Sequence, residues 1–251
     1  MKKNTVCLAF LTLFWLCLAA VAEAVVDVEG EKILLQVDET MFPPEYRNYF
    51  VIENTTPDRR KHSISLFSAQ DKSGKSVVLI INPPSLRGRS AFWDGTTVWT
   101  HIPGELEPRK NELRQSIVGG VFNNMDLLPG PFHRYHQAQF EKEEKDFQYL
   151  KLTPTIPGVP YSHMIMKVNR HQQLPAELTQ YVTEYEIFKR IRFDDVKEVT
   201  NHRRRPGLMK TFSELNPLYQ SEWRLGTQDE QPVPPEAFSV DFLPKLGQVL
   251  K

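Results

Sequence analysis

The fold predicted for this chain follows from residues 77–128, which read VVLIINPPSLRGRSAFWDGTTVWTHIPGELEPRKNELRQSIVGGVFNNMDLL. The pair Asp94-Gly95 lies between two short apolar runs in this stretch. Asp-Gly between apolar runs is a strong signal for a β-hairpin, because a type I′ turn needs a positive φ at both central residues. We therefore predict a hairpin with Asp94-Gly95 as its turn, in which Trp93 faces Thr96.

Both faces of this hairpin are apolar. One face carries Ala91, Trp93, Val98 and Ile102, and the other carries Phe92 and Trp99. An ordinary half-exposed hairpin keeps one face polar. Two explanations stay open: the sheet lies between two layers of core, or it is curved and its concave face holds an apolar ligand.

The rest of the chain is predicted to be mainly β. Short apolar or alternating runs, separated by turn-like clusters, predict strands. These runs cover residues 50–52, 62–68, 77–81, 135–140, 147–153, 163–168, 178–185, 187–193, 208–215 and 222–225. A helix is expected at residues 29–41, where apolar residues recur at helical spacing before Pro43. The last residues are expected to form a short helix or tail. Many short strands with regular turns indicate a sandwich or a barrel.

Residues 1–24 read as a secretory signal peptide. Lys2 and Lys3 precede an apolar run at residues 6–21, and a small-x-small site ends at Ala24. The apolar run of 16 residues is short for a membrane span. We expect the mature protein to begin at Val25, to comprise residues 25–251 as a single domain, and to reside in the periplasm.

The composition excludes several classes of protein. Both cysteines, Cys7 and Cys17, lie in the expected signal peptide, so the mature chain has no disulfide and no Cys-based chemistry. Removing the leader reduces the 31 basic and 31 acidic residues to 29 and 30. This balance argues against a nucleic-acid binder.

No catalytic motif stands out. The sequence contains no Gly-x-Ser-x-Gly, no Gly-x-Gly-x-x-Gly and no P-loop. His133 and His136 could suggest a metal pair, but on a strand this spacing places them on opposite faces. The basic run at residues 203–205 is expected to be a solvated turn. We expect no catalysed reaction, no metal and no cofactor.

Residues 116–128 change in character from the charged segment before them. The segment is apolar but contains Gly119-Gly120 and Asn123-Asn124. A glycine weakens a helix by roughly 1 kcal/mol relative to alanine. We therefore expect a short, loosely held helix, with mobility or close packing as the reason for the glycines.

The central stretch also carries a family resemblance. Its order is an apolar strand, a Pro-rich turn, an aromatic strand, Asp94-Gly95 with Trp99 and Pro103, a basic segment and Gly-Gly-Val-Phe-Asn-Asn-Met-Asp-Leu-Leu. This order resembles the LolA-like outer-membrane lipoprotein-sorting proteins. The resemblance implies a curved antiparallel half-barrel sheet of the LolA/LolB type, with a few short helices covering its concave face. In this family, the region of residues 116–128 covers the open mouth of the half-barrel.

The function implied by the resemblance is carriage of a lipoprotein or lipid in the periplasm. Acyl chains would be buried beneath the cover and passed from an inner-membrane transporter to an outer-membrane acceptor. A monomer is expected, although the sequence leaves the oligomeric state open. The side chains expected to line the cavity and its cover are Leu79, Phe92, Trp99, Ile117, Phe122, Met125 and Met164. A Phe122→Ala change would alter lipid affinity if Phe122 belongs to the cover, and would cost about 3–5 kcal/mol of stability if it is plain core.

Two other functions remain open. A related half-barrel occurs in sensors of envelope stress, and such a protein would use the charged residues 105–114 to bind a membrane-embedded partner. The other is a lipid-binding subunit of an export pump. The Pro-rich stretch at residues 154–160 departs from the carrier pattern, so the identity of the cargo does not transfer.

Overall fold

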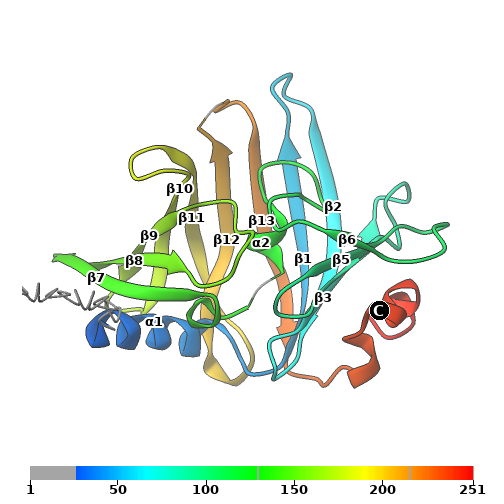
Figure 1. Cartoon of the computed structure of the whole chain (residues 1–251), viewed down its shortest axis with the longest axis horizontal. Coiled ribbons are helices and arrows are strands. Elements are labelled where there is room, and N and C mark those ends of the chain that lie inside the picture. Colours follow the sequence, from blue (N-terminus) through cyan, green and yellow to red (C-terminus); the bar gives the residue numbers. More distant parts are fainter. Residues whose placement is uncertain (1–26, 129, 215, 251) are drawn as a thin grey trace, which may run out of the picture.

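The chain folds around one curved antiparallel sheet, as predicted (Figure 1). This computed structural model describes residues 27–128, 130–214 and 216–250. The expected signal peptide lies outside the described residues. Within the described residues, no helix is both long and apolar enough to cross a membrane.

Thirteen strands and a few short helices make up the described chain. In chain order they are α1 (Val28–Met41), β1 (Tyr46–Thr55), β2 (Lys61–Gln70), β3 (Ser76–Asn82), β4 (Ser90–Trp93), β5 (Val98–His101), β6 (Arg109–Asn111), α2 (Asn124–Leu127), η1 (Phe132–Arg134), β7 (His136–Glu144), β8 (Phe147–Pro154), β9 (His163–Asn169), β10 (Leu174–Tyr181), β11 (Ile187–Glu198), η2 (Thr200–His202), β12 (Arg204–Ser213), β13 (Gln220–Asp229), η3 (Pro235–Ala237) and η4 (Val240–Gln248).

The order of the strands explains how the concave face is covered. The sheet runs β6-β5-β4-β3-β2-β1-β13-β12-β11-β10-β9-β8-β7, so β6 and β7 form its two opposite edges. These edge strands are consecutive in the chain, and the connection between them must cross the whole sheet. We call residues 112–128 of this connection the cover segment. Its buried apolar side chains belong to the same hydrophobic cluster as the concave face of the sheet.

Alternation along the strands separates the two faces of the sheet. In β1, every second residue is buried and the residues between them are half-exposed. Successive side chains of a strand point to opposite faces. The buried positions of β1 are Tyr46, Asn48, Phe50, Ile52 and Asn54.

The β4–β5 hairpin forms, but its turn differs from the prediction. Trp93 pairs with Val98, not with Thr96. Gly95 has a φ of +103°, whereas Thr96 is not among the residues with positive φ. A positive φ only at the first central residue is typical of a type II′ turn, so the predicted type I′ turn at Asp94-Gly95 is wrong.

The side chain of Asp94 accounts for this turn. Its Oδ1 accepts hydrogen bonds from the backbone N–H groups of Thr96 at 2.8 Å and of Thr97 at 2.7 Å. Partial burial opposes ionisation, but these bonds and one from Trp99 hold the pKa of Asp94 below its ordinary value. Asp94 thus organises the turn from the position before it. The shift of two residues keeps each side chain on its predicted face, except that Ile102 lies beyond β5 and is 40% exposed.

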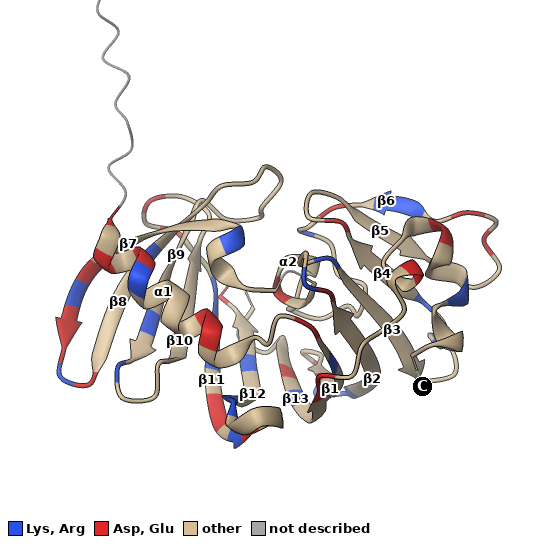
Figure 2. Ribbon diagram, turned by 90° about the horizontal axis from the view of Figure 1, so that it is seen from below, with Lys and Arg blue, Asp and Glu red and all other residues tan. Residues whose placement is uncertain are grey.

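The sheet has a core on each face, so the first explanation for the doubly apolar hairpin is correct. On the concave face, α1 and the cover segment pack over the strands. On the outer face, η4 packs against β4 and β5, and the backbone oxygen of Leu243 accepts a hydrogen bond from Ser90 Oγ at 3.1 Å. The helices predicted on the concave face are present, and the structure adds η4 on the outer face. Figure 2 shows α1 and this C-terminal segment at opposite ends of the sheet, with acidic and basic residues interspersed.

The first helix also protects an edge of the sheet. Asp27 caps α1 by accepting from the N–H groups of Glu29 and Gly30, both at 3.0 Å. Its other oxygen accepts from Phe140 N at 2.9 Å, and Glu31 accepts from Ala138 N at 2.7 Å. Both donors lie on the edge strand β7. Helix α1 thereby satisfies N–H groups that an open edge would offer to another chain.

Candidate functional site

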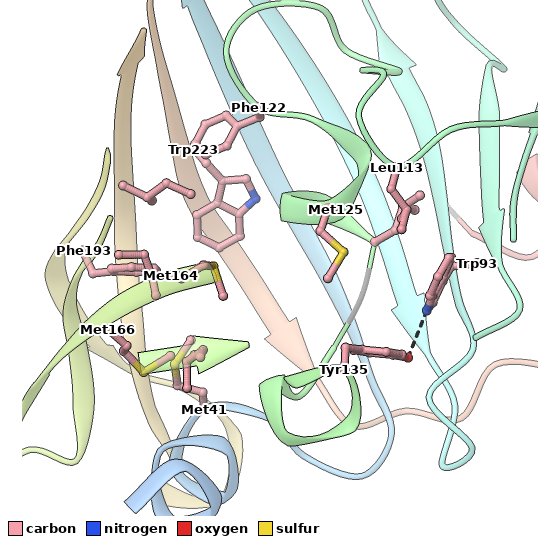
Figure 3. Close-up of a cluster of buried hydrophobic side chains, with 14 of the residues drawn as sticks. Met41, Trp93, Leu113, Phe122, Met125, Tyr135, Met164, Met166, Phe193 and Trp223 are labelled. Carbon is pink, nitrogen blue, oxygen red and sulfur yellow. Dashed lines mark hydrogen bonds between the residues drawn. The ribbon is translucent and has the colours of Figure 1, made fainter. Parts of the chain in front are cut away.

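An apolar cavity lies between the concave face of the sheet and the cover segment. Its volume is about 100 Å³. Aromatic side chains from strands, helices and the cover segment surround this cavity. In Figure 3, Phe122 and Trp223 lie in the upper part of the view, and Met125, Met164 and Met41 lie below them. The aromatic residues that line it are Phe42, Tyr46, Phe50, Phe122, Phe132, Tyr135, His136, Tyr161, Phe193 and Trp223.

Methionine is concentrated at this cavity. The lining includes Met41, Met125, Met164 and Met209, which are four of the six methionines in the sequence. Methionine has a flexible, polarizable side chain that adapts to partners of different shape. In this structure the cavity is small: an engineered apolar cavity of roughly 150 Å³ holds one benzene. A long ligand would require these walls to move.

The seven side chains predicted to line the cavity divide into three groups. Phe122, Met125 and Met164 line it. Ile117 is half-buried and packs against the same hydrophobic cluster without reaching the cavity.

Leu79, Phe92 and Trp99 point away from the cavity to the outer face of the sheet. They pack there with the cluster formed by the C-terminal residues. The reason is the alternation of the strands: their neighbours Val78, Ile80 and Trp93 occupy the concave face. The prediction chose the wrong face for these three residues.

The cover segment is held down by a buried ion pair. Lys189 Nζ on β11 pairs with Asp126 Oδ2, and the two side chains are only 1% and 3% exposed. Lys189 also donates to the backbone oxygen of Val121 at 3.1 Å, and Gln180 Nε2 donates to Asp126 Oδ1 at 3.0 Å. Strands β10 and β11 thus fix the middle of the cover.

A second set of bonds fixes the glycine pair. Asn54 Nδ2 on β1 donates to the backbone oxygen of Val118 at 3.0 Å. Ser221 Oγ on β13 accepts from Val121 N at 2.9 Å and donates to Asn54 Oδ1 at 2.7 Å. Gly120 passes so close to these side chains that an added Cβ would lie 2.0 Å from Asn54 Oδ1. Of the two reasons considered for the glycines, close packing applies to Gly120.

The cover is also folded on itself. Asn124 Nδ2 donates to the oxygen of Glu112 at 2.9 Å, and its Oδ1 accepts from Ile117 N at 3.2 Å. A reciprocal pair of bonds between Asn123 and Asp126 caps α2, which has only four residues. The predicted short helix is present as α2, but it is not loosely held, because polar side chains tie most of the segment into a hydrogen-bonded loop.

Histidine and tyrosine form a polar link in the cavity wall. His136 Nδ1 lies 3.0 Å from the backbone oxygen of Phe132, and Nε2 lies 2.9 Å from the hydroxyl of Tyr161. A carbonyl only accepts, so Nδ1 carries the proton and Nε2 accepts from Tyr161. Burial lowers the pKa of His136 to about 4, although the bond to Phe132 opposes this change. His136 is therefore neutral at pH 7.

The other histidines do not form a metal site with it. His133 Nδ1 lies 2.9 Å from Asp38 Oδ2. Among the residues that the structure describes, no group of three or more His, Cys, Asp or Glu side chains could hold a metal ion.

A larger cleft lies on the surface next to the cavity. Its volume is about 990 Å³. Its lining includes the Pro-rich residues 157–160, the last residue of β6, and residues 112–114 at the start of the cover. Tyr161 lines both the cleft and the cavity. The Tyr161 ring is therefore part of the wall between the interior and the surface.

The cavity also has a polar end that the sequence analysis missed. Tyr46, Asn48 and Arg205 line it there. Arg205 was expected in a solvated turn, but it lies in β12 and is only 6% exposed. No local signal revealed this position, since only Arg204 of this run is exposed and the next four residues of β12 are all buried.

Comparison with known proteins agrees with this architecture. A family model described as "Uncharacterized protein" matches residues 72–245. No curated protein matches the sequence significantly.

Three solved structures share the fold over most of the chain. A LolA superfamily protein from Nitrosomonas europaea has a TM-score of 0.76 at 22% identity, covering 85% of this chain and 98% of its own. A protein domain described as outer-membrane lipoprotein-sorting, from Vibrio parahaemolyticus, has a TM-score of 0.76 at 13% identity, covering 86% and 98%. A DUF1329 family protein from Desulfovibrio piger has a TM-score of 0.75 at 14% identity, covering 86% and 98%. At these identities, the similarity establishes the fold.

Proposed function

We propose that this chain, which belongs to the family described as "Uncharacterized protein" and has the LolA-like fold, is a periplasmic carrier of a lipid or lipoprotein. It would bury acyl chains reversibly between the concave face and the cover segment, without a chemical step. The observation that carries this proposal is the methionine-lined apolar cavity beneath a cover that spans the sheet.

The energetics fit a reversible carrier. Each buried methylene contributes roughly 0.8 kcal/mol, so an acyl chain supplies ample affinity and release becomes the difficulty. The polar contacts of the cover, above all the Lys189–Asp126 pair, favour the closed form. Part of the free energy of ligand binding is therefore spent on opening the cover segment. This cost lowers the net affinity, so that the ligand can be released again.

The geometry suggests a route by which the acyl chain of a ligand enters the cavity. The cleft beside the Pro-rich loop is open to the surface, and Tyr161 lies between it and the cavity. Rotation of this side chain, together with the start of the cover, would connect the two spaces. The similar proteins from Nitrosomonas europaea and Vibrio parahaemolyticus are described as a LolA superfamily protein and as an outer-membrane lipoprotein-sorting domain, which supports lipid-linked cargo.

The test has two parts. Protein purified from a periplasmic extract without detergent should carry acyl-containing lipid, identified by mass spectrometry. N-terminal sequencing of the same material should begin at Val25. An empty cavity together with a tightly bound protein partner would support the sensor instead, and retention at Met1 in the membrane fraction would contradict the periplasmic carrier.

A matched pair of variants tests the location of the site. Phe122 and Phe92 are buried to a similar extent, 1% and 3% exposed, but on opposite faces of the sheet. Phe122→Leu and Phe92→Leu should therefore cost similar stability. In titrations with a fluorescent fatty acid, Phe122→Leu should change Kd at least about threefold and Phe92→Leu should not. Equal effects of the two variants would place the ligand elsewhere.

A further inference from the structure

The polar end of the cavity contains a buried cation. Arg205 is 6% exposed, and its guanidinium lies 5.3 Å from the centroid of the Trp223 ring. Arg205 Nη1 donates to Gln228 Oε1 and lies 3.5 Å from Asn48 Oδ1. Arg205 Nε is buried and has no acceptor among the described residues. The guanidinium is therefore only partly satisfied by the protein.

No carboxylate of the described residues forms an ion pair with Arg205. The adjacent strand residue Asp229 follows Gln228, but it accepts two hydrogen bonds from Arg47, both at 2.9 Å. Arginine stays protonated in proteins, and an unpaired buried charge is unfavourable. Lys189, the other deeply buried cation under the cover, does have a carboxylate partner in Asp126.

Two buried donors at this end of the cavity, Arg205 Nε and Gln228 Nε2, have no acceptor in the described chain. Gln228 Nε2 is buried without an acceptor in the described chain, because its Oε1 accepts from Arg205. The hydroxyl of Tyr46 donates to Gln70 Oε1 at 3.2 Å. Burial raises the pKa of Tyr46 to about 12, so its phenol is neutral at pH 7 and supplies no negative charge. Two donors therefore lack an acceptor here, and no carboxylate among the described residues pairs with the guanidinium.

We propose that Arg205 binds the carboxylate of an acyl ligand whose chain occupies the methionine-lined cavity, and that the ligand class is a free fatty acid. The fork of a guanidinium matches a carboxylate with two parallel hydrogen bonds. The proposal rests on the proposed function and narrows it, since acyl chains of a lipoprotein are linked as esters or amides and carry no such charge.

The test compares three ligands on the delipidated mature protein: dodecanoate, methyl dodecanoate and acetate. The wild type should bind dodecanoate at least tenfold more tightly than the methyl ester, and acetate weakly. Arg205→Met should remove this preference, and Arg205→Lys should retain part of it because it keeps the charge without the fork. Arg204→Met is the matched control, because Arg204 is exposed on the same strand, and it should leave the preference unchanged.

The outcomes separate this proposal from the proposed function. Equal affinity of the wild type for acid and ester would overturn the carboxylate site and leave acyl binding intact. If the wild type binds neither dodecanoate nor its methyl ester, both the carboxylate site and the proposed function are overturned. Tight acetate binding that depends on Arg205 would show a site for free anions and overturn the fatty-acid assignment. If Arg205→Met does not fold, the ratio of the affinities for dodecanoate and its methyl ester is compared between the wild type and Arg205→Lys. An equal ratio in these two proteins would overturn the carboxylate site.

Discussion

Lys189 and Asp126 form an ion pair that joins the start of β11 to the cover segment, with both side chains almost fully buried. Each partner has further hydrogen bonds: Asp126 accepts from Gln180 Nε2 and from Asn123 N, and Lys189 donates to the oxygen of Val121. Burial lowers the pKa of Lys189, and Asp126 opposes that change. A pair so well satisfied holds the cover in one place on the sheet.

Removing one partner of this pair should be costly. Lys189→Met leaves Asp126 as a buried charge without a cation, and a broken buried pair typically costs about 3–5 kcal/mol. The double variant Lys189→Met/Asp126→Leu should lose less than the sum of the two single changes. Urea unfolding of all four proteins measures the coupling. Lys142→Met, which breaks the exposed pair with Glu144, is the control and should leave the unfolding curve unchanged. If it destabilised the protein as much as Lys189→Met, the special role of the buried pair would be contradicted.

The two adjacent glycines of the cover provide a test of whether it is docked or mobile. Gly119 and Gly120 both have positive φ, +68° and +73°. A Cβ at Gly119 meets nothing within 4 Å, whereas one at Gly120 would collide with Asn54 and Ser221. Gly119→Ala should cost about 1 kcal/mol from the backbone alone, and Gly120→Ala should cost at least about 2 kcal/mol. Thermal and urea unfolding compare them, and equal losses would mean that the cover is not docked as described.

The turn between β4 and β5 should depend on its glycine. Gly95 has a φ of +103° and nothing lies within 4 Å of an added Cβ, so any penalty comes from the backbone. Gly95→Val should cost more than about 1 kcal/mol, because a β-branched residue strongly resists positive φ. The control Thr97→Val keeps the branched shape at a residue of ordinary φ and should change stability by less than about 0.5 kcal/mol. Equal melting temperatures for Gly95→Val and wild type would show that the turn is placed wrongly.

The neutral state of His136 should make stability depend on pH. Its folded pKa of about 4 lies below the ordinary value of 6.5, so between these values the unfolded chain binds more protons than the folded one. Stability should therefore fall as pH decreases from about 6.5 to 4, by up to about 3 kcal/mol from this residue. Urea unfolding of wild type and His136→Gln across this range isolates the effect as the difference between the two. Parallel pH profiles would contradict a buried neutral histidine.

Much of the fold was predictable because strand patterns and turn residues act locally. The alternation in residues 62–68 and the β-branched run at residues 77–81 correctly placed β2 and β3. The helix expected at residues 29–41 is α1, Val28–Met41. The face of each strand followed the alternation, but which face is concave depends on where η4 and the cover pack. That choice is tertiary, and Leu79, Phe92 and Trp99 were therefore assigned to the wrong side.

The polar part of the site could not be predicted from spacing. Lys189 and Asp126 are 63 residues apart, and Asn54 and Ser221 are 167 residues apart. Nothing local marks such residues as partners, because the sheet alone brings them together. Arg205 was missed for another reason: a basic run usually signals solvent, and only the extension of β12 into that run turns the residue inward.

The pairing of β1 with β13 joins the first and last strands at the centre of the sheet. Arg47 and Asp229, which meet there, are 182 residues apart. During synthesis, β1 therefore has no partner on its β13 side until residues 220–229 are available. Contacts of such long range slow folding, and an unpaired edge invites other strands. The central pair of the sheet is thus the one whose strands are separated by most of the chain.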